Sequence, residues 1–154
     1  MNKSDKLDEL RLEVGMVADK VNTREDFYSG IINIIGSHLP VGCGVAIYGC
    51  DNGYFSNIVS YGKVNEKKYS KYGDCMFSVC SIRGKVTIQT EANSIKAYAP
   101  FYDGHHLIGI LFIEFQTVNY KITEEDFIFL EEIARYIEIK GVQYNDWTID
   151  NNSV

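Results

Sequence analysis

The residues of this sequence with the most reactive side chains are four cysteines, Cys43, Cys50, Cys75 and Cys80. Four residues separate Cys75 from Cys80, whereas the cysteines of zinc and redox pairs are usually separated by two. Cys43 and Cys50 lie at opposite ends of a predicted strand. We therefore expect inert, buried thiols. Cys75 is the candidate for a reactive thiol, because it lies at the start of a predicted helix, where the helix dipole lowers the pKa of a thiol.

The three histidines form no pattern that indicates a metal or haem site. His105 and His106 are adjacent in a predicted strand just after a turn, so their side chains point to opposite faces and cannot hold one ion together. His38 lies near the end of a predicted helix. The sequence also lacks the nucleophile elbow, the phosphate-binding loop and the dinucleotide fingerprint. We expect no cofactor and no metal.

Composition limits the classes of protein. A chain of 154 residues with 45% apolar and 23% charged residues is expected to form one globular domain. No apolar run approaches the roughly 20 residues of a membrane span, and the charged amino terminus lacks the apolar middle of a secretory signal. We therefore expect a cytoplasmic protein with reduced cysteines and no membrane partner. A net charge of −6 argues against nucleic acid as a partner.

Apolar residues near the amino terminus step by three and four positions, as on one face of a helix. They are Leu7, Leu10, Val14, Val17 and Val21. Two interpretations are open: the stripe lies on its own domain, or it also supplies the seam of a homodimer.

Two further helices are predicted from their first residues. Thr23 and Asp26 resemble a capping box that starts a second helix, which ends before Pro40. Thr123 precedes three acidic residues, which suit the first turn of a last helix.

Four strands are predicted in two hairpins. Residues 42–48 and 54–61 are joined by the turn sequence Asp51-Asn52-Gly53, and residues 97–115 form a longer hairpin that turns at Asp103-Gly104. A short additional strand covers residues 85–89. The second arm of the long hairpin, residues 106–115, shows almost no polar alternation. Both of its faces should therefore be covered, as in the middle of a sheet.

Between the two hairpins lies the least regular part of the chain, residues 62–73. It carries four lysines, Lys63, Lys67, Lys68 and Lys71, against one acid, Glu66. This basic segment is either a solvated loop or a rim that steers a small anion. Asp74 suits the N-cap of a short buried helix over residues 75–82, which Gly84 ends.

These elements predict an α+β domain with an antiparallel sheet and the terminal helices packed on one face. The domain covers residues 1–154, with a core at 23–140, an amphipathic N-terminal helix at 1–22 and a polar, partly mobile tail at 141–154.

The order of elements, together with the segments SIRGKVTI and AYAPFYDGHHLIGILFIEF, resembles the GAF family of small-molecule sensory domains over residues 23–140. The resemblance implies five or six antiparallel strands and a ligand cavity on the face opposite the terminal helices. Residues 62–82 would roof this cavity. PAS domains are related in architecture but place their helices differently.

Two kinds of single-domain GAF protein are similar in size. In the free methionine-R-sulfoxide reductases, Cys75 would match a cysteine near the pocket, but the partner cysteines of that family have no counterpart here. A lone thiol can form a sulfenic acid, but it lacks the thiol that would resolve it. The second kind is the nitrate-receptor type, which accompanies a two-component system. Here an anion would sit at the start of the 75–82 helix, where backbone N–H groups and the helix dipole favour negative charge.

The leading hypothesis is therefore a non-enzymatic sensor that binds a small molecule or anion, with nitrate as the best single candidate, and modulates a partner such as a histidine kinase. Two alternatives are open: the protein is a thiol reductase that uses Cys75, or it is a purely structural dimerisation module whose pocket has been filled. The expected ligand-binding residues are Tyr48, Ile58, Cys75, Met76, Phe77 and Tyr98. The signal would leave through the N- and C-terminal helices, which would also form a homodimer.

Overall fold

The computed structural model describes residues 2–73, 75–118 and 120–144. Within them the chain forms one six-stranded antiparallel sheet in the order β3-β2-β1-β6-β5-β4. The elements in chain order are α1 (Lys3–Gly15), the 3-10 helix η1 (Val17–Asp19), α2 (Arg24–Ser37), β1 (Gly44–Asp51), β2 (Tyr54–Gly62), β3 (Tyr69–Lys71), α3 (Met76–Arg83), β4 (Thr87–Thr90), β5 (Ser94–Asp103), β6 (His106–Gln116) and α4 (Glu124–Gly141). The α+β prediction is confirmed.

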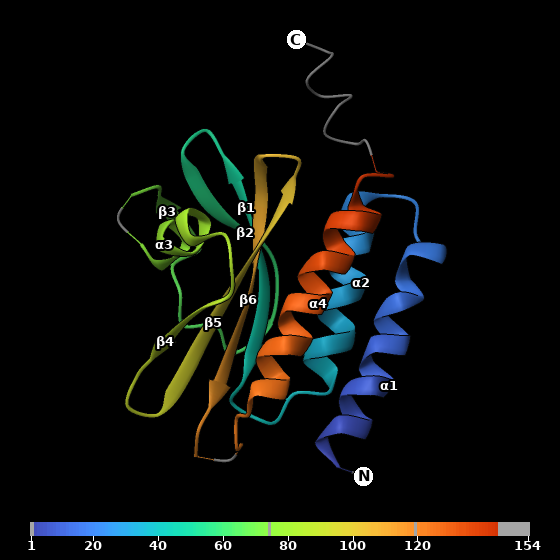
Figure 1. Ribbon diagram of the computed structural model, residues 1–154, viewed down its shortest axis with the longest axis vertical. Helices are drawn as coiled ribbons and strands as arrows, with labels where there is room; N and C mark the ends of the chain where they lie inside the picture. Colours follow the sequence, from blue (N-terminus) through green and yellow to red (C-terminus); the bar gives the residue numbers. More distant parts are fainter. Residues whose placement is uncertain (1, 74, 119, 145–154) are drawn as a thin grey trace.

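The helices divide between the two faces of the sheet (Figure 1). α2 packs on β1 and β2, α4 packs on β5 and β6, and α1 lies outside them against both helices. α3 lies on the opposite face, over β4, β5 and β6. The terminal helices therefore share one face, as predicted, and the other face is left to α3 and the segment that precedes it.

The long hairpin forms as the sequence predicts, with β6 between β1 and β5 in the middle of the sheet. Leu111, Ile113 and Phe115 are buried beneath the terminal helices, whereas Ile110 and Phe112 are buried on the α3 face. Both faces of the strand are thus covered. The two loop residues are Gly104 and His105, because Asp103 pairs with His106.

The predicted caps also form. The Thr23 side chain accepts a hydrogen bond from the Asp26 N–H at 3.1 Å, and Thr123 and Asp126 make a reciprocal capping box. Each satisfies backbone donors that a helix leaves open at its first turn. Gly84 ends α3 in the left-handed conformation, with a φ of 69°.

The apolar stripe of the first segment packs against its own domain. Leu7, Leu10, Val14 and Val17 are buried in the core beneath the terminal helices, and Val21 packs against it. This is the first of the two interpretations that the sequence left open. The homodimer remains a prediction, and it would have to use other side chains than these buried ones.

The structure differs from the sequence prediction in two elements. The predicted N-terminal helix at 1–22 is divided into α1, which ends at Gly15, and the separate 3-10 helix η1. β3 was not predicted, because Tyr69–Lys71 lies in a lysine-rich segment without apolar alternation, and it forms only by pairing with the start of β2.

Two predictions fall wholly or partly outside the described residues: Asp74 as the N-cap of α3, a position that Cys75 occupies, and the polar, partly mobile tail at 141–154. Residues 145–154 of this tail lie outside them. Its first residues do not match the prediction, because Gly141 belongs to α4 and Tyr144 is buried, with its hydroxyl donating to the Ala18 carbonyl oxygen at 3.1 Å.

None of the helices in the described residues is long and apolar enough to cross a membrane.

The sheet has no room for a side chain at Gly109, where β6 passes β1. A methyl group there would lie 2.4 Å from the Tyr48 carbonyl oxygen and 2.8 Å from the Phe101 ring. We expect Gly109→Ala to lower the free energy of unfolding by about 2–3 kcal/mol, measured by urea denaturation. The control is Gly15→Ala at the end of α1, where a methyl group meets nothing within 4 Å and should be neutral or slightly stabilising. Equal stability of the two variants would contradict this packing.

Candidate ligand site

Five aromatic side chains fill the space between α3 and the sheet. We call them the ring cluster: Tyr48, Phe55, Phe77, Tyr98 and Phe112, all with no exposed surface. Phe77 from α3 lies at its centre, with ring centroids 4.4 Å from Tyr48, 5.3 Å from Tyr98 and 5.4 Å from Phe55. The part of the domain in which the resemblance implies a cavity is therefore packed with rings.

The ring cluster holds one polar atom without a partner. Among the described residues, the buried hydroxyl of Tyr48 has no hydrogen-bond partner. Burial raises the pKa of Tyr48, and the nearby side chain of Asn57 only partly offsets this. An unpartnered buried hydroxyl destabilises a fold by about 1–3 kcal/mol, and the side chain of Asn57, which pairs with Tyr48 across β1 and β2, is the group close enough to offset part of that cost.

A buried carboxylate fastens the roof loop, residues 62–73, to the sheet. Glu114 of β6 is fully buried. Its two oxygens accept hydrogen bonds from the Asn65 backbone N–H at 2.9 Å and from the Asn65 side-chain amide at 2.7 Å. Hydrogen bonds to a charged acceptor are about twice as strong as neutral ones. Glu114 therefore holds the roof loop in one position.

A second buried group, Lys96, lies opposite Glu114 on the neighbouring strand β5. Its ammonium donates to the Asn65 carbonyl oxygen at 2.7 Å and to Glu66 Oε2 at 2.8 Å. The side chains of Lys96 and Glu66 are only 7% and 16% exposed. The roof loop is thus bound to the sheet through both a buried anion and a buried cation.

Tyr98 connects this ion pair to the ring cluster. Its hydroxyl lies 3.1 Å from Glu66 Oε2 and 3.3 Å from Gln89 Oε1, and its single proton can be donated to one of them at a time. Burial raises the pKa of Tyr98, and the negative charge of Glu66 raises it further. Tyr98 is therefore a neutral donor at the inner end of the network.

The pKa of Lys96 reflects two opposing effects. Burial alone would lower it, but the hydrogen bond to Glu66 and the charges of Glu66, Glu91 and Glu114 outweigh burial and raise it above the ordinary value of 10.5. Lys96 is therefore charged at neutral pH, and the carboxylates around it outnumber it.

This network opens into a groove of about 430 Å³, which we call the roof groove. Ten residues line it: Glu66, Lys67, Tyr69, Ser70, Lys71, Cys75, Met76, Gln89, Glu91 and Lys96. The volume lies within the range of small-molecule sites. Acidic and basic groups, a thiol and a thioether all face the same space.

The structure brings five of the six predicted ligand-binding residues together. Tyr48, Phe77 and Tyr98 belong to the ring cluster, whereas Cys75 and Met76 pack against it and line the roof groove.

The sixth predicted residue, Ile58, does not join them. The register of β1 against β2 shifts between Ile47 and Tyr48, so the pairs Ile47–Val59 and Tyr48–Asn57 leave Ile58 without a partner. Its side chain is 48% exposed and lies over Gly49, on the face opposite Tyr48. A β-bulge redirects side chains in this way.

The polar residues of the site were missed by the sequence prediction. Lys96 and Glu114 each interrupt an apolar strand, between Ile95 and Ala97 and between Ile113 and Phe115. A lone charge in a strand expected to be covered on both faces is the signal that could have found Glu114, whereas Lys96 lies just before the predicted hairpin at 97–115. Gln89 and Glu91, at the end of an edge strand, carry no such signal.

The cysteines differ in their surroundings. Cys80 is buried, and burial raises its pKa to about 12 despite the opposing effects of Thr87 and Arg83. Cys43 is also buried, and burial likewise raises its pKa. Cys75 is partly exposed, with its sulfur 3.5 Å from Ser78 Oγ. Cys75 is thus the cysteine that faces the roof groove.

The histidines lie outside the site. His105 and His106 are exposed at the tip of the long hairpin, and the Nδ1 atom of the exposed His38 bonds the Ile34 carbonyl oxygen. In the parts of the chain that the structure describes, no three His, Cys, Asp or Glu residues are placed to hold a metal ion.

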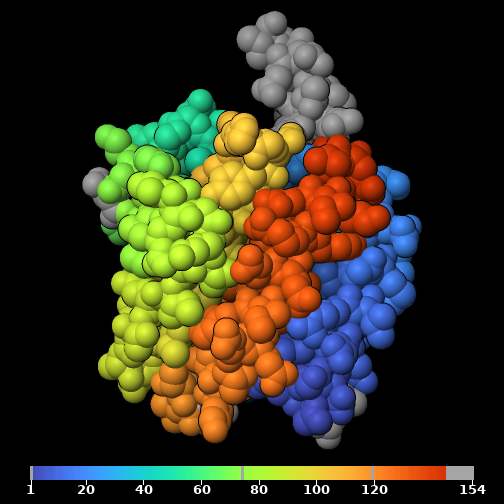
Figure 2. All heavy atoms as spheres, viewed as in Figure 1, coloured from blue at the N-terminus to red at the C-terminus, as the bar shows by residue number. Residues whose placement is uncertain are grey.

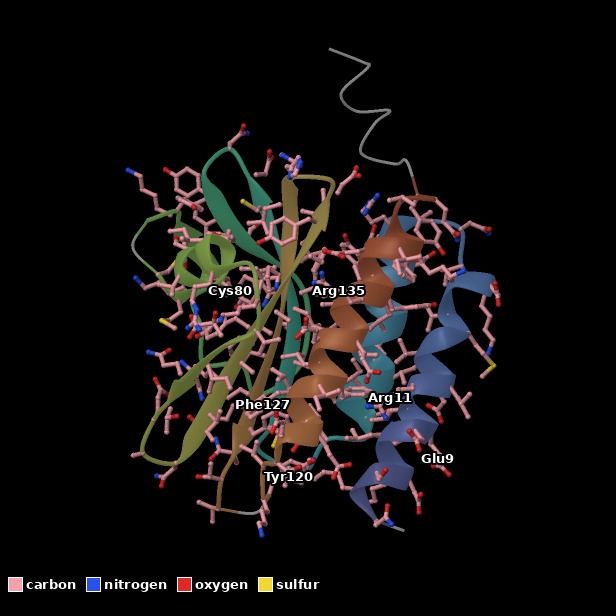
Figure 3. The ribbon with its side chains drawn as sticks, viewed as in Figure 1. Glu9, Arg11, Cys80, Tyr120, Phe127 and Arg135 are labelled. Carbon is pink, nitrogen blue, oxygen red and sulfur yellow. The ribbon has the colours of Figure 1, made fainter. Side chains whose placement is uncertain are left out.

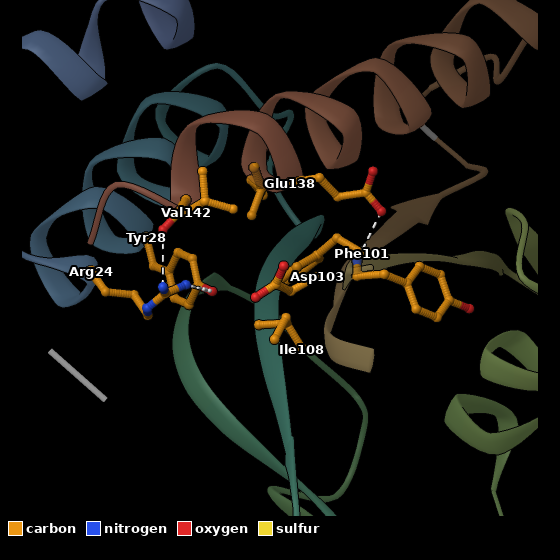
Figure 4. A pocket seen from close by; sticks show the side chains of 10 residues that line it. Arg24, Tyr28, Phe101, Asp103, Ile108, Glu138 and Val142 are labelled. Atoms are coloured by element: carbon orange, nitrogen blue, oxygen red, sulfur yellow. Dashed lines mark hydrogen bonds between the residues drawn. The ribbon is translucent and has the colours of Figure 1, made fainter. Parts of the chain in front are cut away.

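A second, much smaller pocket lies between α2, α4 and the end of β5 (Figure 4). It encloses only about 10 Å³, which is space for at most one water molecule. Arg24 closes one side by donating to the Gly141 carbonyl oxygen at 2.9 Å, and the Tyr102 N–H donates to Glu138 at 2.8 Å. This pocket is a small packing gap where β5 meets α4, and it is too small for a ligand.

No family model matches the sequence, and no curated protein matches it. Solved structures match the fold over most of the chain, and several of them are GAF domains.

One similar structure is the GAF domain of the Acinetobacter phosphoenolpyruvate-protein phosphotransferase, with a TM-score of 0.74, 16% identity, and coverage of 98% of this chain and 99% of that one. The nlh2 GAF domain of A. aeolicus, in an inactive state, gives a TM-score of 0.73 at 14% identity, covering 89% of this chain and 96% of that one. The free methionine-R-sulfoxide reductase of Neisseria meningitidis, in complex with its substrate, gives a TM-score of 0.79 at 12% identity, covering 93% and 92%.

The fold of this protein is therefore that of a GAF domain, as its sequence resemblance predicted. The solved structures with this fold include GAF domains and free methionine-R-sulfoxide reductases.

The ion pair beneath the roof loop gives a prediction for stability. Lys96→Met leaves Glu66 buried without its cation and should lower the free energy of unfolding by about 3 kcal/mol. The double variant Lys96→Met with Glu66→Gln removes both charges and should recover most of the loss. The control is Asp8→Asn, which removes an exposed ion pair with Arg11 and should change stability by less than about 1 kcal/mol. Additive losses in the double variant would contradict the pairing.

The same pair predicts how stability depends on pH. Because the pKa of Lys96 is higher in the folded than in the unfolded protein, its contribution is complete below the unfolded pKa and is lost as the pH rises through the folded pKa. On the alkaline side of neutrality, the difference in stability between the wild type and Lys96→Met should therefore persist and shrink only at strongly alkaline pH. A difference that disappears between pH 5 and 8 would contradict this assignment.

Proposed function

We propose that this protein is a sensory domain that binds a small polar molecule in the roof groove and passes its occupancy to a partner protein. One observation carries the proposal: the buried network of Lys96, Glu66 and Tyr98 opens into this groove. A buried ion pair is less stabilising than an apolar core of the same volume. Its position at the wall of a groove of ligand size therefore favours a role in recognition in addition to its role in holding the roof loop.

The charges around the groove indicate the chemistry of the ligand. Glu66 and Glu91 line the groove beside Lys96, whereas Lys67 and Lys71 of the roof loop line it too. A ligand with a donor group toward the carboxylates and an anionic group toward the lysines would satisfy both. A small zwitterion such as a free amino acid fits this description better than a bare anion.

Nitrate remains the specific candidate from the sequence. The support for it is the first turn of α3, where the backbone N–H groups of Met76 and Phe77 have no carbonyl of their own helix to bond. Nitrate would bind there by hydrogen bonds and the helix dipole, beside Lys71. Testing nitrate and amino acids side by side separates the two chemistries.

A route from the groove to the terminal helices runs along β5. The inner part of β5 carries Lys96 and Tyr98. Its outer part bonds α4 directly, with Arg135 donating to the Pro100 carbonyl oxygen at 2.8 Å and the Tyr102 N–H donating to Glu138. A ligand that shifts β5 would therefore shift α4. The proposed partners that respond to the shift of α4 are a histidine kinase and a second copy of the chain. Both interactions would take place in the cytoplasm.

A thermal-shift screen with nitrate, nitrite, free amino acids and nucleotides tests the proposal. A ligand present at about one hundred times its Kd stabilises the folded state by about 2.7 kcal/mol, which for a chain of this size raises Tm by roughly 5–10 °C. Glu66→Gln should abolish this shift. The matched control is Glu125→Gln, on the exposed face of α4, which should retain it.

Two outcomes would contradict the proposal. One is that no compound of the screen raises Tm. The other is that Glu66→Gln retains the full shift, which would place the ligand outside the roof groove.

A second candidate function rests on the position of Cys75. Its partly exposed thiol lines the same groove, and the free methionine-R-sulfoxide reductases share the fold. In such a reaction the thiolate would take the oxygen of a sulfoxide, giving a thioether and a cysteine sulfenic acid. Two equivalents of an external thiol would then return the sulfenic acid to the thiol, releasing water and a disulfide.

Consumption of free methionine sulfoxide in the presence of dithiothreitol tests the enzyme. If the protein is such a reductase, Cys75→Ser should abolish turnover. Cys50→Ser should leave turnover unchanged, because Cys50 lies outside the roof groove. Absence of turnover by the wild type excludes this candidate and leaves the sensor.

A further inference from the structure

The two edges of the sheet are protected unequally. β3, at one edge, contains Lys71 and follows Lys67 and Lys68, and lysines on an edge strand discourage pairing with another chain. β4, at the other edge, reads Thr-Ile-Gln-Thr, without a charge or a proline. It pairs with β5 on one side, and no other strand of the described residues covers its second side. β4 is therefore open to strand addition.

A groove of about 440 Å³ runs beside this open edge, between β4 and the first turns of α4. Figure 2 shows the yellow-green surface of β4 and β5 next to the orange start of α4. The floor of the groove is apolar. Ile88 of β4 and Ile128 of α4 are 43% and 49% exposed, and Phe127 lies on the sheet-facing side of α4 (Figure 3). We call this surface the β4–α4 groove.

The rim of the β4–α4 groove is acidic. Its only charged lining residues in the described part of the chain are Glu124 and Glu131. Both are exposed, and neither forms an ion pair with another described residue. They are seven residues apart on α4 and hence about 10 Å apart along the helix axis. Phe127 and Ile128 lie between them.

We infer that the β4–α4 groove binds an extended, basic segment of a partner protein, which adds to the sheet as a strand beside β4. The backbone of the segment would bond the open edge, as in other complexes formed by strand addition. On the side that faces α4, an apolar residue would occupy the groove, and flanking lysines or arginines would reach Glu124 and Glu131.

Strand geometry limits the sequence of such a segment. Side chains on one face of a strand recur every second residue, about 6.8 Å apart. The Cα atoms of two basic residues four positions apart are therefore about 13 Å apart. Lysine and arginine side chains are long and flexible enough to reach Glu124 and Glu131, which are about 10 Å apart along the helix axis. The expected pattern is basic, any, apolar, any, basic.

A second copy of this chain is a poor occupant by the same argument. β4 carries no basic residue, and pairing two copies along β4 would bring two acidic rims together, which like-charge repulsion opposes. The complementarity favours a basic partner.

A synthetic peptide tests the inference with the full-length protein. The probe is a capped, fluorescein-labelled peptide of about ten residues, in which threonine alternates with lysine and valine, so that one face reads lysine, valine, lysine. Binding is followed by fluorescence anisotropy. We expect saturable binding that weakens with added salt and at least a tenfold loss of affinity in Glu124→Lys with Glu131→Lys.

The matched control carries the same change of charge elsewhere, in Glu9→Lys with Glu25→Lys. Glu9 lies on α1, on the side of the helix layer away from β4 (Figure 3), and Glu25 is exposed in the first turn of α2. This variant should bind the peptide within about twofold of the wild type. Circular dichroism of both double variants shows that they are folded.

Three outcomes would overturn the inference. The peptide fails to bind, or the Glu124→Lys/Glu131→Lys variant binds as tightly as the control, or a peptide with glutamate in place of lysine binds equally well. Self-association of the protein that Ile88→Glu abolishes would instead assign this edge to a second copy. Hydrogen exchange gives an independent readout, because strand addition should slow exchange of the β4 amides.

Discussion

The buried carboxylate of Glu114 and the buried ammonium of Lys96 lie opposite each other on β6 and β5, the two strands of the long hairpin. Both form hydrogen bonds with the same residue of the roof loop, Asn65. Neither charge would be tolerated there without these bonds, because an unpaired buried charge is strongly destabilising. The roof loop adds apolar contacts at its two ends, where Val64 packs against the ring cluster and Tyr72 stacks on Phe55. The sheet and the loop therefore depend on each other through charge-assisted hydrogen bonds.

This constraint decides where a ligand can be bound. Because the ring cluster fills the space under α3, the open volume between α3, the roof loop and the sheet lies at the margin, where the roof loop, the start of α3, the end of β4 and the start of β5 meet. A ligand in this groove would contact the same groups that hold the roof loop. Binding and the position of the roof loop are thereby coupled.

Tyr102 extends this coupling to both faces of the sheet. Its hydroxyl donates to the Ser81 carbonyl oxygen of α3 at 3.1 Å, while its backbone N–H bonds Glu138 of α4. Arg135, visible on the sheet side of α4 in Figure 3, holds the neighbouring Pro100. The end of β5 is thus tied to the helix on each face, which the proposed transmission of a signal from the roof groove requires.

Much of this fold could be predicted from the sequence because its signals are local. The Asp-Gly turn, the two threonine caps and the unbroken apolar run of β6 each depend on a few neighbouring residues. β3 and Ile58 could not be placed in this way, since one depends on pairing with a distant strand and the other on a bulge in β2.

The apolar residues of the candidate site could be predicted from the sequence, and its polar residues could not. Its apolar members, such as Tyr48 and Phe77, follow from strand and helix patterns. The polar network does not, because the partners of Lys96 are 30 and 31 residues away in an irregular loop. Only the anomaly of a charge in an apolar strand indicates that such partners exist.

Hydrogen exchange measured by mass spectrometry tests the account most directly, on the protein with and without the compound that raises its Tm most. The account predicts slower exchange in the roof loop, residues 62–73, and along β4 and β5, with a smaller effect on α4. Protection confined to α1 and α2, with the roof loop unchanged, would contradict it.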